Sequence, residues 1–167
     1  MRHPSLSLLG FLWAWLPLFY CQPVKIERVI ADAKGLAEII IARIQGHQFP
    51  PVSLRIHGLD FIPEELPMQS LETVDAALGI FHRVLSSLPY EAPVAQISND
   101  VENLQSLMRL LGVLMGCPIQ RPPSSDDLGN LTELLANSPY TTSAVTLGRL
   151  QRCLQSMGSY LDYGQHC

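Results

Sequence analysis

The positions of proline constrain the fold of this chain more than any other feature of its sequence. Proline lacks the backbone N–H that a helix interior needs, and its ring clashes with the preceding turn, so long helices lie between prolines. Beyond the first 23 residues, the prolines gather at 50–67, 89–93 and 118–139. Four proline-free segments remain, at 24–49, 68–88, 94–117 and 140–167. Each is long enough for a helix of about 20 residues.

Apolar residues recur at intervals of three and four in all four segments, which is the period of an amphipathic helix. The stripes are Ile26, Val29, Ile30, Ala33, Leu36, Ile40 and Ile44; Leu71, Val74, Leu78, Phe81, Leu85 and Leu88; Ile97, Val101, Leu104, Met108, Leu111 and Met115; and Ser143, Leu147, Leu150, Leu154, Met157 and Leu161. We expect Ser70 to cap the second helix and Gly46 to end the first in a left-handed conformation. Four such helices bury their stripes together, which predicts an all-α four-helix bundle.

The lengths of the connections indicate the topology of that bundle. About five residues join the second and third helices, which makes them antiparallel neighbours. The other two connections, roughly 47–69 and 117–140, are long enough to cross the length of a helix. They permit an up-up-down-down topology with two long crossover loops.

The cysteines agree with this topology. Cys117 ends the third helix and Cys167 ends the chain, so parallel third and fourth helices bring both to one end of the bundle. Antiparallel helices would separate them by about 30 Å, whereas a disulfide needs Cα atoms about 4.4–6.8 Å apart. We therefore expect one disulfide, Cys117–Cys167. Cys153 lies inside the fourth helix, and we interpret it as a half-buried thiol that acts as a small hydrophobe, with an intermolecular bridge as the alternative.

The first 22 residues have the order of a secretory signal peptide. Arg2 and His3 precede the apolar run 6–21, which is short for a membrane span and is interrupted by Pro17. We expect cleavage within about 21–23 and a secreted, extracellular domain over 23–167, with no membrane insertion after the signal is removed. An uncleaved anchor is the less favoured alternative.

Composition and motifs argue against several classes of function. The chain has 11 basic and 15 acidic residues without a Lys or Arg cluster, which argues against nucleic-acid binding. It contains no Glu-x-x-His, His-Glu-x-x-His, Cys-x-x-Cys or P-loop motif, and its helix stripes hold no paired carboxylates. We therefore expect no enzyme, no catalytic residues, no metal site and no cofactor.

Two helix flanks carry apolar residues next to the core stripes. At 100° per residue the flanks are Lys25, Asp32, Ile39 and Arg43 on the first helix, and Gln96, Asn103, Leu107 and Leu110 on the third. Apolar side chains among polar ones are candidates for contact with a partner. The equally weighted alternative is that they widen the core stripe or lie under a crossover loop.

Two loop features add candidates. The cluster Gly58-Leu59-Asp60-Phe61-Ile62-Pro63 either packs onto the bundle or is exposed for a partner, and the sequence leaves both open. Asn130-Leu131-Thr132 is an N-glycosylation acceptor in a secreted chain. The apolar pattern around it, Leu128, Leu131, Leu134 and Leu135, indicates a short extra helix.

Several motifs in collinear order resemble the leptin family of long-chain helical cytokines. They are GLDFIP at 58–63, QISNDVENL at 96–104, the FLW and LFY of the signal segment at 11–20, PYTT at 139–142, RLQ at 149–151, and the terminal Cys167 with Cys117. The chain departs from the family at Arg121-Pro122-Pro123, where the family carries a tryptophan, and at Cys153, where it has a small polar residue. Ala31, Gly35 and Ser106 also differ from the family's helix faces.

The resemblance implies an up-up-down-down bundle that is a monomeric secreted hormone. Its partner would be the leptin receptor ectodomain, a class I cytokine receptor that signals through Janus kinases, and its physiological role the regulation of energy balance. In the family, one face of helices one and three engages the receptor's cytokine-binding module, which corresponds here to Asp32, Ile39, Arg43, Gln96, Asn103 and Leu107. A second surface engages an immunoglobulin-like domain and corresponds to Leu59, Asp60, Phe61, Ile62, Thr141 and Thr142.

A lipid-binding function is the alternative to the cytokine function. Amphipathic helices can also open around an apolar ligand, which would make the chain a secreted helical lipid carrier. Such a carrier is expected to have strongly basic polar faces or a dense disulfide frame, and this chain has neither. The cytokine hypothesis is therefore favoured.

Overall fold

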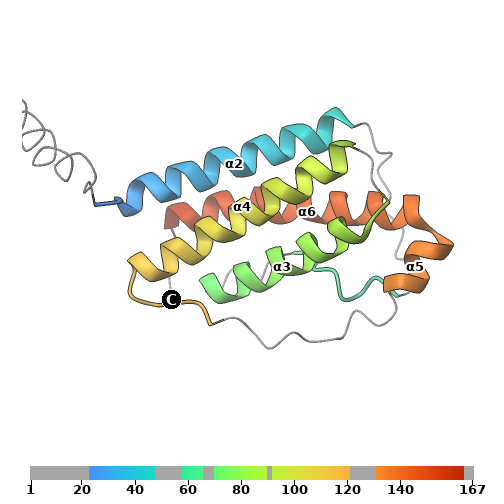
Figure 1. Ribbon diagram of the computed structural model, residues 1–167. Coiled ribbons are helices and arrows are strands. Elements are labelled where there is room, and N and C mark those ends of the chain that lie inside the picture. Colours follow the sequence, from blue (N-terminus) through green and yellow to red (C-terminus); the bar gives the residue numbers. More distant parts are fainter. Residues whose placement is uncertain (1–22, 48–57, 66–69, 90–91, 121–130, 164–167) are drawn as a thin grey trace, which may run out of the picture.

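The computed structural model describes residues 23–47, 58–65, 70–89, 92–120 and 131–163. These residues form helices α2 (Ile26–Gly46), α3 (Leu71–Ser87), α4 (Ala92–Leu114), α5 (Leu131–Asn137) and α6 (Pro139–Tyr163), and no strand occurs among them (Figure 1). The all-α prediction is confirmed. The expected signal peptide, the acceptor Asn130 and the terminal Cys167 lie outside the described residues.

The helix ends agree with the sequence in part. The Ser70 cap is confirmed: its hydroxyl accepts the backbone N–H of Thr73 at 3.3 Å, and the Thr73 hydroxyl accepts the N–H of Ser70 at 3.3 Å. The left-handed cap at Gly46 is wrong. Gly46 is the last residue of α2, and the next residue, His47, has a φ of −87°. The N–H of His47 bonds to the carbonyls of Ile44 and Gln45, which ends the helix in a tight turn that needs no positive φ.

A left-handed glycine does end α4. Gly116 has a φ of +81°, its N–H bonds to the Val113 carbonyl at 3.1 Å, and the N–H of Cys117 bonds to the Gly112 carbonyl at 2.9 Å. This pair of hydrogen bonds is a Schellman motif, and it turns the chain back across the end of the helix. Gly112 is required there because a Cβ atom would lie 2.8 Å from the Cys117 carbonyl oxygen. The backbone at Cys117 is therefore positioned by α4 itself.

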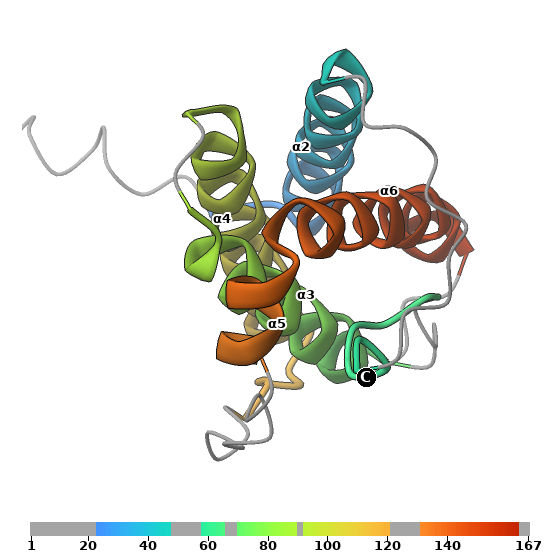
Figure 2. The same cartoon turned by 90° about the vertical axis from the view of Figure 1, so that its right-hand side faces the viewer.

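The four long helices form a bundle. In Figure 1, α2 and α3 run from left to right, and α4 and α6 run from right to left. Viewed along the bundle in Figure 2, the helices occupy four corners, with α2 next to α4 and α6, and with α3 opposite α2. The short α5 packs on α6.

The core lies where the predicted stripes meet. The second and fourth stripes are buried throughout, and Phe81, Leu104 and Leu150 are among the largest side chains with no exposure. In α2 the outer members Ile26, Ile30 and Leu36 are only half-buried, because they pack at the edge of the core. None of the helices in the described ranges is long and apolar enough to span a membrane.

Polar contacts fix how the helices pack against each other. Asp75 on α3 is 1% exposed, and Arg109 on α4 donates from Nε to its Oδ1 at 2.7 Å. Gln105, also on α4, donates to the backbone carbonyl of Asp75 at 2.9 Å. Lys34 on α2 pairs with Asp162 on α6. Because an unpaired buried carboxylate costs several kcal/mol, the Asp75 contacts specify the register of α3 against α4.

Candidate functional site

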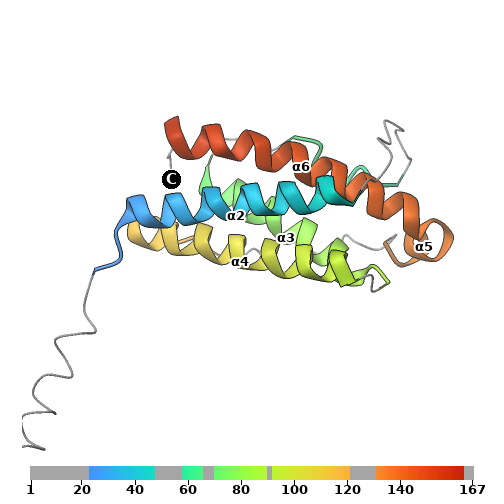
Figure 3. The same cartoon turned by 90° about the horizontal axis from the view of Figure 1, so that it is seen from above.

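The six residues expected on one face of the first and third helices lie on α2 and α4, which are neighbours in the bundle (Figure 3). Five of these side chains are exposed, and Leu107 is half-buried against the core: Asp32, Ile39, Arg43, Gln96, Asn103 and Leu107. We call this set the α2/α4 surface. Its members come from two helices that pack against each other, with Arg43 near the end of α2 beside Asp100 in the first half of α4.

A buried carboxylate contacts two residues of this surface. Asp100 on α4 is nearly inaccessible, its Oδ1 accepts the side-chain amide of Gln96 at 2.9 Å, and its Oδ2 lies 3.0 Å from the Nε of Arg43. Asp100 is not among the residues predicted from the sequence, although its spacing of four from Gln96 is a signal for a contact on one helix face. Asp100 therefore accepts a hydrogen bond from Gln96 and balances the charge of Arg43 as an ion pair, in which its Oδ2 makes no hydrogen bond with the described residues.

The sequence left open whether the apolar residues on these helix flanks widen the core stripe or are exposed. Ile39 is 49% exposed, so it does not widen the core stripe of α2. Leu110 on α4 is also exposed, while Leu107 packs partly on the core. Exposed apolar side chains with polar neighbours are the pattern of an interface centre with a rim.

The second expected site lies on the segment 58–65 and the start of α6. The sequence left open whether the cluster 58–63 packs onto the bundle or is exposed, and the structure shows that some of its residues do each. Leu59 and Ile62 are buried in the core, Phe61 is half-buried against it, and Asp60 is exposed. On α6, Thr141 is half-buried and Thr142 is buried, with its hydroxyl bonded to the Ser138 carbonyl at 2.9 Å. In this structure Leu59, Ile62 and Thr142 therefore support the surface from inside, and Asp60, Phe61 and Thr141 reach the solvent.

Arg149 fixes the segment 58–65 onto α6. It is 4% exposed, and its Nη1 donates to the carbonyl oxygens of Leu59 at 2.6 Å and Ile62 at 2.8 Å, while its Nη2 donates to Glu64 at 2.9 Å. In the sequence, Arg149 stands out only as part of the RLQ motif at 149–151. Nothing in its local pattern indicates that a cation inside α6 binds carbonyls about 90 positions earlier in the chain.

Cys153 lies one turn after Arg149 and is confirmed as a thiol that packs in the core. It is fully buried, and its Sγ lies 3.8 Å from the Pro63 carbonyl oxygen, to which it donates a weak hydrogen bond. It is more deeply buried than the half-buried position expected, because the segment 58–65 covers it. Cys153 and Arg149 therefore hold the same segment.

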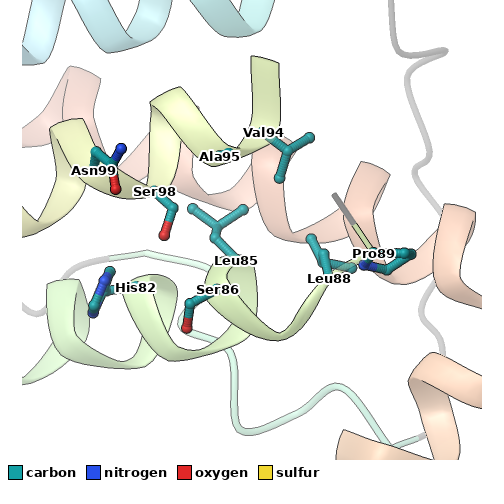
Figure 4. Close-up of a pocket in the computed structure, with 9 residues that line it drawn as sticks. All are labelled: His82, Leu85, Ser86, Leu88, Pro89, Val94, Ala95, Ser98 and Asn99. Carbon is teal, nitrogen blue, oxygen red and sulfur yellow. The ribbon is translucent and has the colours of Figure 1, made fainter. Parts of the chain in front are cut away.

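The described part of the chain offers little for other chemistry. Within the ranges that the structure describes, no group of three or more His, Cys, Asp or Glu side chains is placed to hold a metal ion. A small pocket lies between α3 and α4 and contains none of the residues of either expected surface (Figure 4). Its volume of about 100 Å³ is below the 300–1,000 Å³ typical of sites for larger ligands.

Comparison with known proteins extends over nearly the whole chain. The family model described as Leptin matches residues 25–167. Leptin from Sminthopsis crassicaudata is 42% identical over 163 residues, which cover 96% of this chain and 97% of that protein. Leptin from Macaca mulatta is 40% identical and leptin from Homo sapiens 38% identical, each over 164 residues that cover 96% of this chain and 98% of the relative.

Proposed function

The chain belongs to the leptin family, and from that premise we propose that it is a secreted hormone that binds and clusters a class I cytokine receptor of the leptin-receptor type. Leptins are hormones and not enzymes, and the all-helical bundle fits a helical cytokine. Clustering two receptor chains would activate their associated Janus kinases. The expected role in energy balance belongs to this proposal.

The observation that carries the proposal is the arrangement of the α2/α4 surface. Six residues from two distant parts of the sequence lie on two adjacent helices, and the buried Asp100 bonds to Gln96 and forms an ion pair with Arg43. Side chains that are already fixed lose less conformational entropy on binding. We infer that this surface engages the receptor's cytokine-binding module.

The second contact of the proposal uses the segment 58–65 with the start of α6. Asp60, Phe61 and Thr141 supply the accessible side chains, and buried Leu59, Ile62 and Thr142 hold them. Arg149 makes this segment a fixed feature of the bundle. A second surface separate from the first allows one monomeric ligand to hold two receptor chains, because each chain can occupy a different face.

The remaining parts of the proposal concern covalent processing and topology. We propose the up-up-down-down topology of a long-chain cytokine, a Cys117–Cys167 disulfide, removal of residues 1–22 during secretion, and a glycan acceptor at Asn130. The helix directions in Figure 1 support the topology. The Schellman motif supports the disulfide, because it fixes the backbone at Cys117 at one end of the bundle.

The lipid-carrier alternative has less support. A lipid chain needs a continuous apolar cavity, whereas the core of the bundle is filled by side chains such as Phe81, Leu104 and Leu150. The pocket between α3 and α4 holds about 100 Å³ and is partly polar.

The test applies the purified secreted protein to cells with the leptin receptor and to the same cells without it, and measures phosphorylation of the associated Janus kinase. We expect a response only in the receptor-bearing cells. Ile39→Asp should reduce it, and Val113→Asp, which places the same charge on an exposed apolar position outside the α2/α4 surface, serves as the matched control. Equal responses in both cell lines would disprove the proposal. A stoichiometric lipid found by mass spectrometry would favour the carrier.

A further inference from the structure

Two parts of the chain that are distant in sequence supply the second proposed receptor contact, the segment 58–65 and the start of α6. Arg149 holds the segment at the carbonyls of Leu59 and Ile62. The first described residue of the segment, Gly58, makes a different contact, because it lies against the short helix α5 that directly precedes α6 (Figure 1). This contact connects the two parts of the surface through α5.

Leu134 of α5 packs onto the backbone of Gly58. Gly58 has a φ of +97°, a conformation that glycine adopts without strain. Beyond its chain neighbours, the three atoms nearest to the position of a Cβ at Gly58 all belong to Leu134, with Cδ2 at 3.4 Å and Cδ1 at 3.6 Å. Leu134 is half-buried and packs against the core, to which Leu131 of the same helix belongs. The leucine side chain therefore covers the point at which the segment begins.

The backbone between Leu134 and the start of α6 is tightly bonded. Only Ser138 separates α5 from α6. Its N–H donates to the Leu134 carbonyl at 2.8 Å, and its carbonyl accepts the N–H of Thr142 at 3.0 Å and the Thr142 hydroxyl at 2.9 Å. Pro139 occupies the first position of α6, where its fixed φ suits the start of a helix. These bonds fix Leu134 relative to the α6 part of the surface.

From these contacts we propose that Leu134 is a positioning residue for the second surface, because it holds Gly58 at a fixed place relative to the start of α6. The effect on signalling rests on the proposed receptor function, whereas the positioning itself rests on the Gly58 contact alone. A receptor domain that touches both parts at once binds best when they are already in place, since less conformational entropy is then lost. Leu134 acts through the backbone that it supports and does not need to touch the receptor.

The first test measures this positioning without a receptor. Native-state hydrogen exchange of the full secreted protein follows the N–H of Ile62, which bonds to the Leu59 carbonyl at 3.1 Å. Leu134→Ala should lower its protection about tenfold, because truncation of the leucine uncovers Gly58. Leu134→Met keeps the side-chain volume and should restore most of the protection. The matched control is Leu135→Ala, which truncates the other half-buried leucine of α5 and should lower the protection less than about threefold.

The second test measures binding and signalling separately. Leu134→Ala should leave the affinity for the receptor's cytokine-binding module within about twofold, because the α2/α4 surface is unchanged. The same variant should lower the maximal kinase phosphorylation in receptor-bearing cells at least about threefold, because the second contact is no longer in place. Leu134→Met should recover the signal, and Leu135→Ala should retain it.

The outcomes separate this inference from the proposed function. If Leu134→Ala and Leu135→Ala change the Ile62 protection equally, or if Leu134→Ala signals as the wild type does, the inference is overturned. Parallel loss of binding and signalling would also overturn it, because a general folding defect has that effect. A wild type that neither binds nor signals would instead refute the proposed function, and hydrogen exchange would still decide whether Leu134 positions the segment.

Discussion

Replacing Arg149 by methionine tests whether one buried cation holds the segment 58–65 on the bundle. Methionine keeps the apolar stem and removes the guanidinium, which takes the cationic donor from the Ile62 carbonyl and leaves the Leu59 carbonyl with only the N–H of Ile62. Each of the two hydrogen bonds from this charged donor contributes about 1.5–3 kcal/mol, and the partner Glu64 is mostly exposed and adds little. The expected cost is therefore about 3 kcal/mol, mostly in the local opening of the segment.

Native-state hydrogen exchange measures that cost directly. The N–H of Ile62 bonds to the Leu59 carbonyl at 3.1 Å, and its protection should fall about a hundredfold in the variant, because 1.36 kcal/mol corresponds to a factor of ten. Amides in the centre of α4 should lose less protection. The matched control is Arg152→Met, an exposed arginine on the same helix. If protection of Ile62 is unchanged, or if the control loses as much, the buried hydrogen bonds do not hold the segment and the reasoning is refuted.

Three further predictions follow from the same geometry. The double substitution Asp60→Ala with Phe61→Ala should abolish signalling in receptor-bearing cells while leaving receptor binding within about twofold; parallel loss of both would show that there is no separate second surface. Ser70→Ala should lower the free energy of unfolding by about 1 kcal/mol in urea titrations, because it removes the cap of α3, and a change below about 0.3 kcal/mol would mean that water replaces the cap. Peptide mapping of the secreted protein should recover Cys117 joined to Cys167. A peptide that joins Cys153 to either of them would contradict the proposed topology.

The sequence predicted the helices well because their stripes are local patterns. The spacing of Leu71, Val74 and Leu78 is enough to predict both the helix and the buried face, and Ser70 carries the cap signal in its own side chain. The end of α2 was predicted wrongly at Gly46, because the choice between a left-handed glycine and a tight turn depends on the path of the following chain.

The candidate site was predictable only where its residues share a helix face. Ile39 and Arg43 follow from the wheel, but the partner of Arg43 lies on another helix and Asp100 was missed. Arg149 shows the same limit: its acceptors are backbone carbonyls, which carry no residue-specific signal in a sequence. Contacts of this kind depend on tertiary packing, which local periodicity does not encode.

Because Cys153 is buried, the rate at which its thiol is labelled reports how often the structure around it opens. The thiol lies under the Pro63 carbonyl with no exposed surface, so a thiol-specific reagent reaches it only when the covering segment lifts or the whole bundle unfolds. When closing is faster than reaction, the labelling rate equals the opening equilibrium constant multiplied by the intrinsic reactivity of the thiol. Comparing labelling in dilute urea and in water separates the two routes, because unfolding exposes far more surface than the lifting of one loop. The same burial protects this thiol from oxidation until the covering segment lifts or the fold opens.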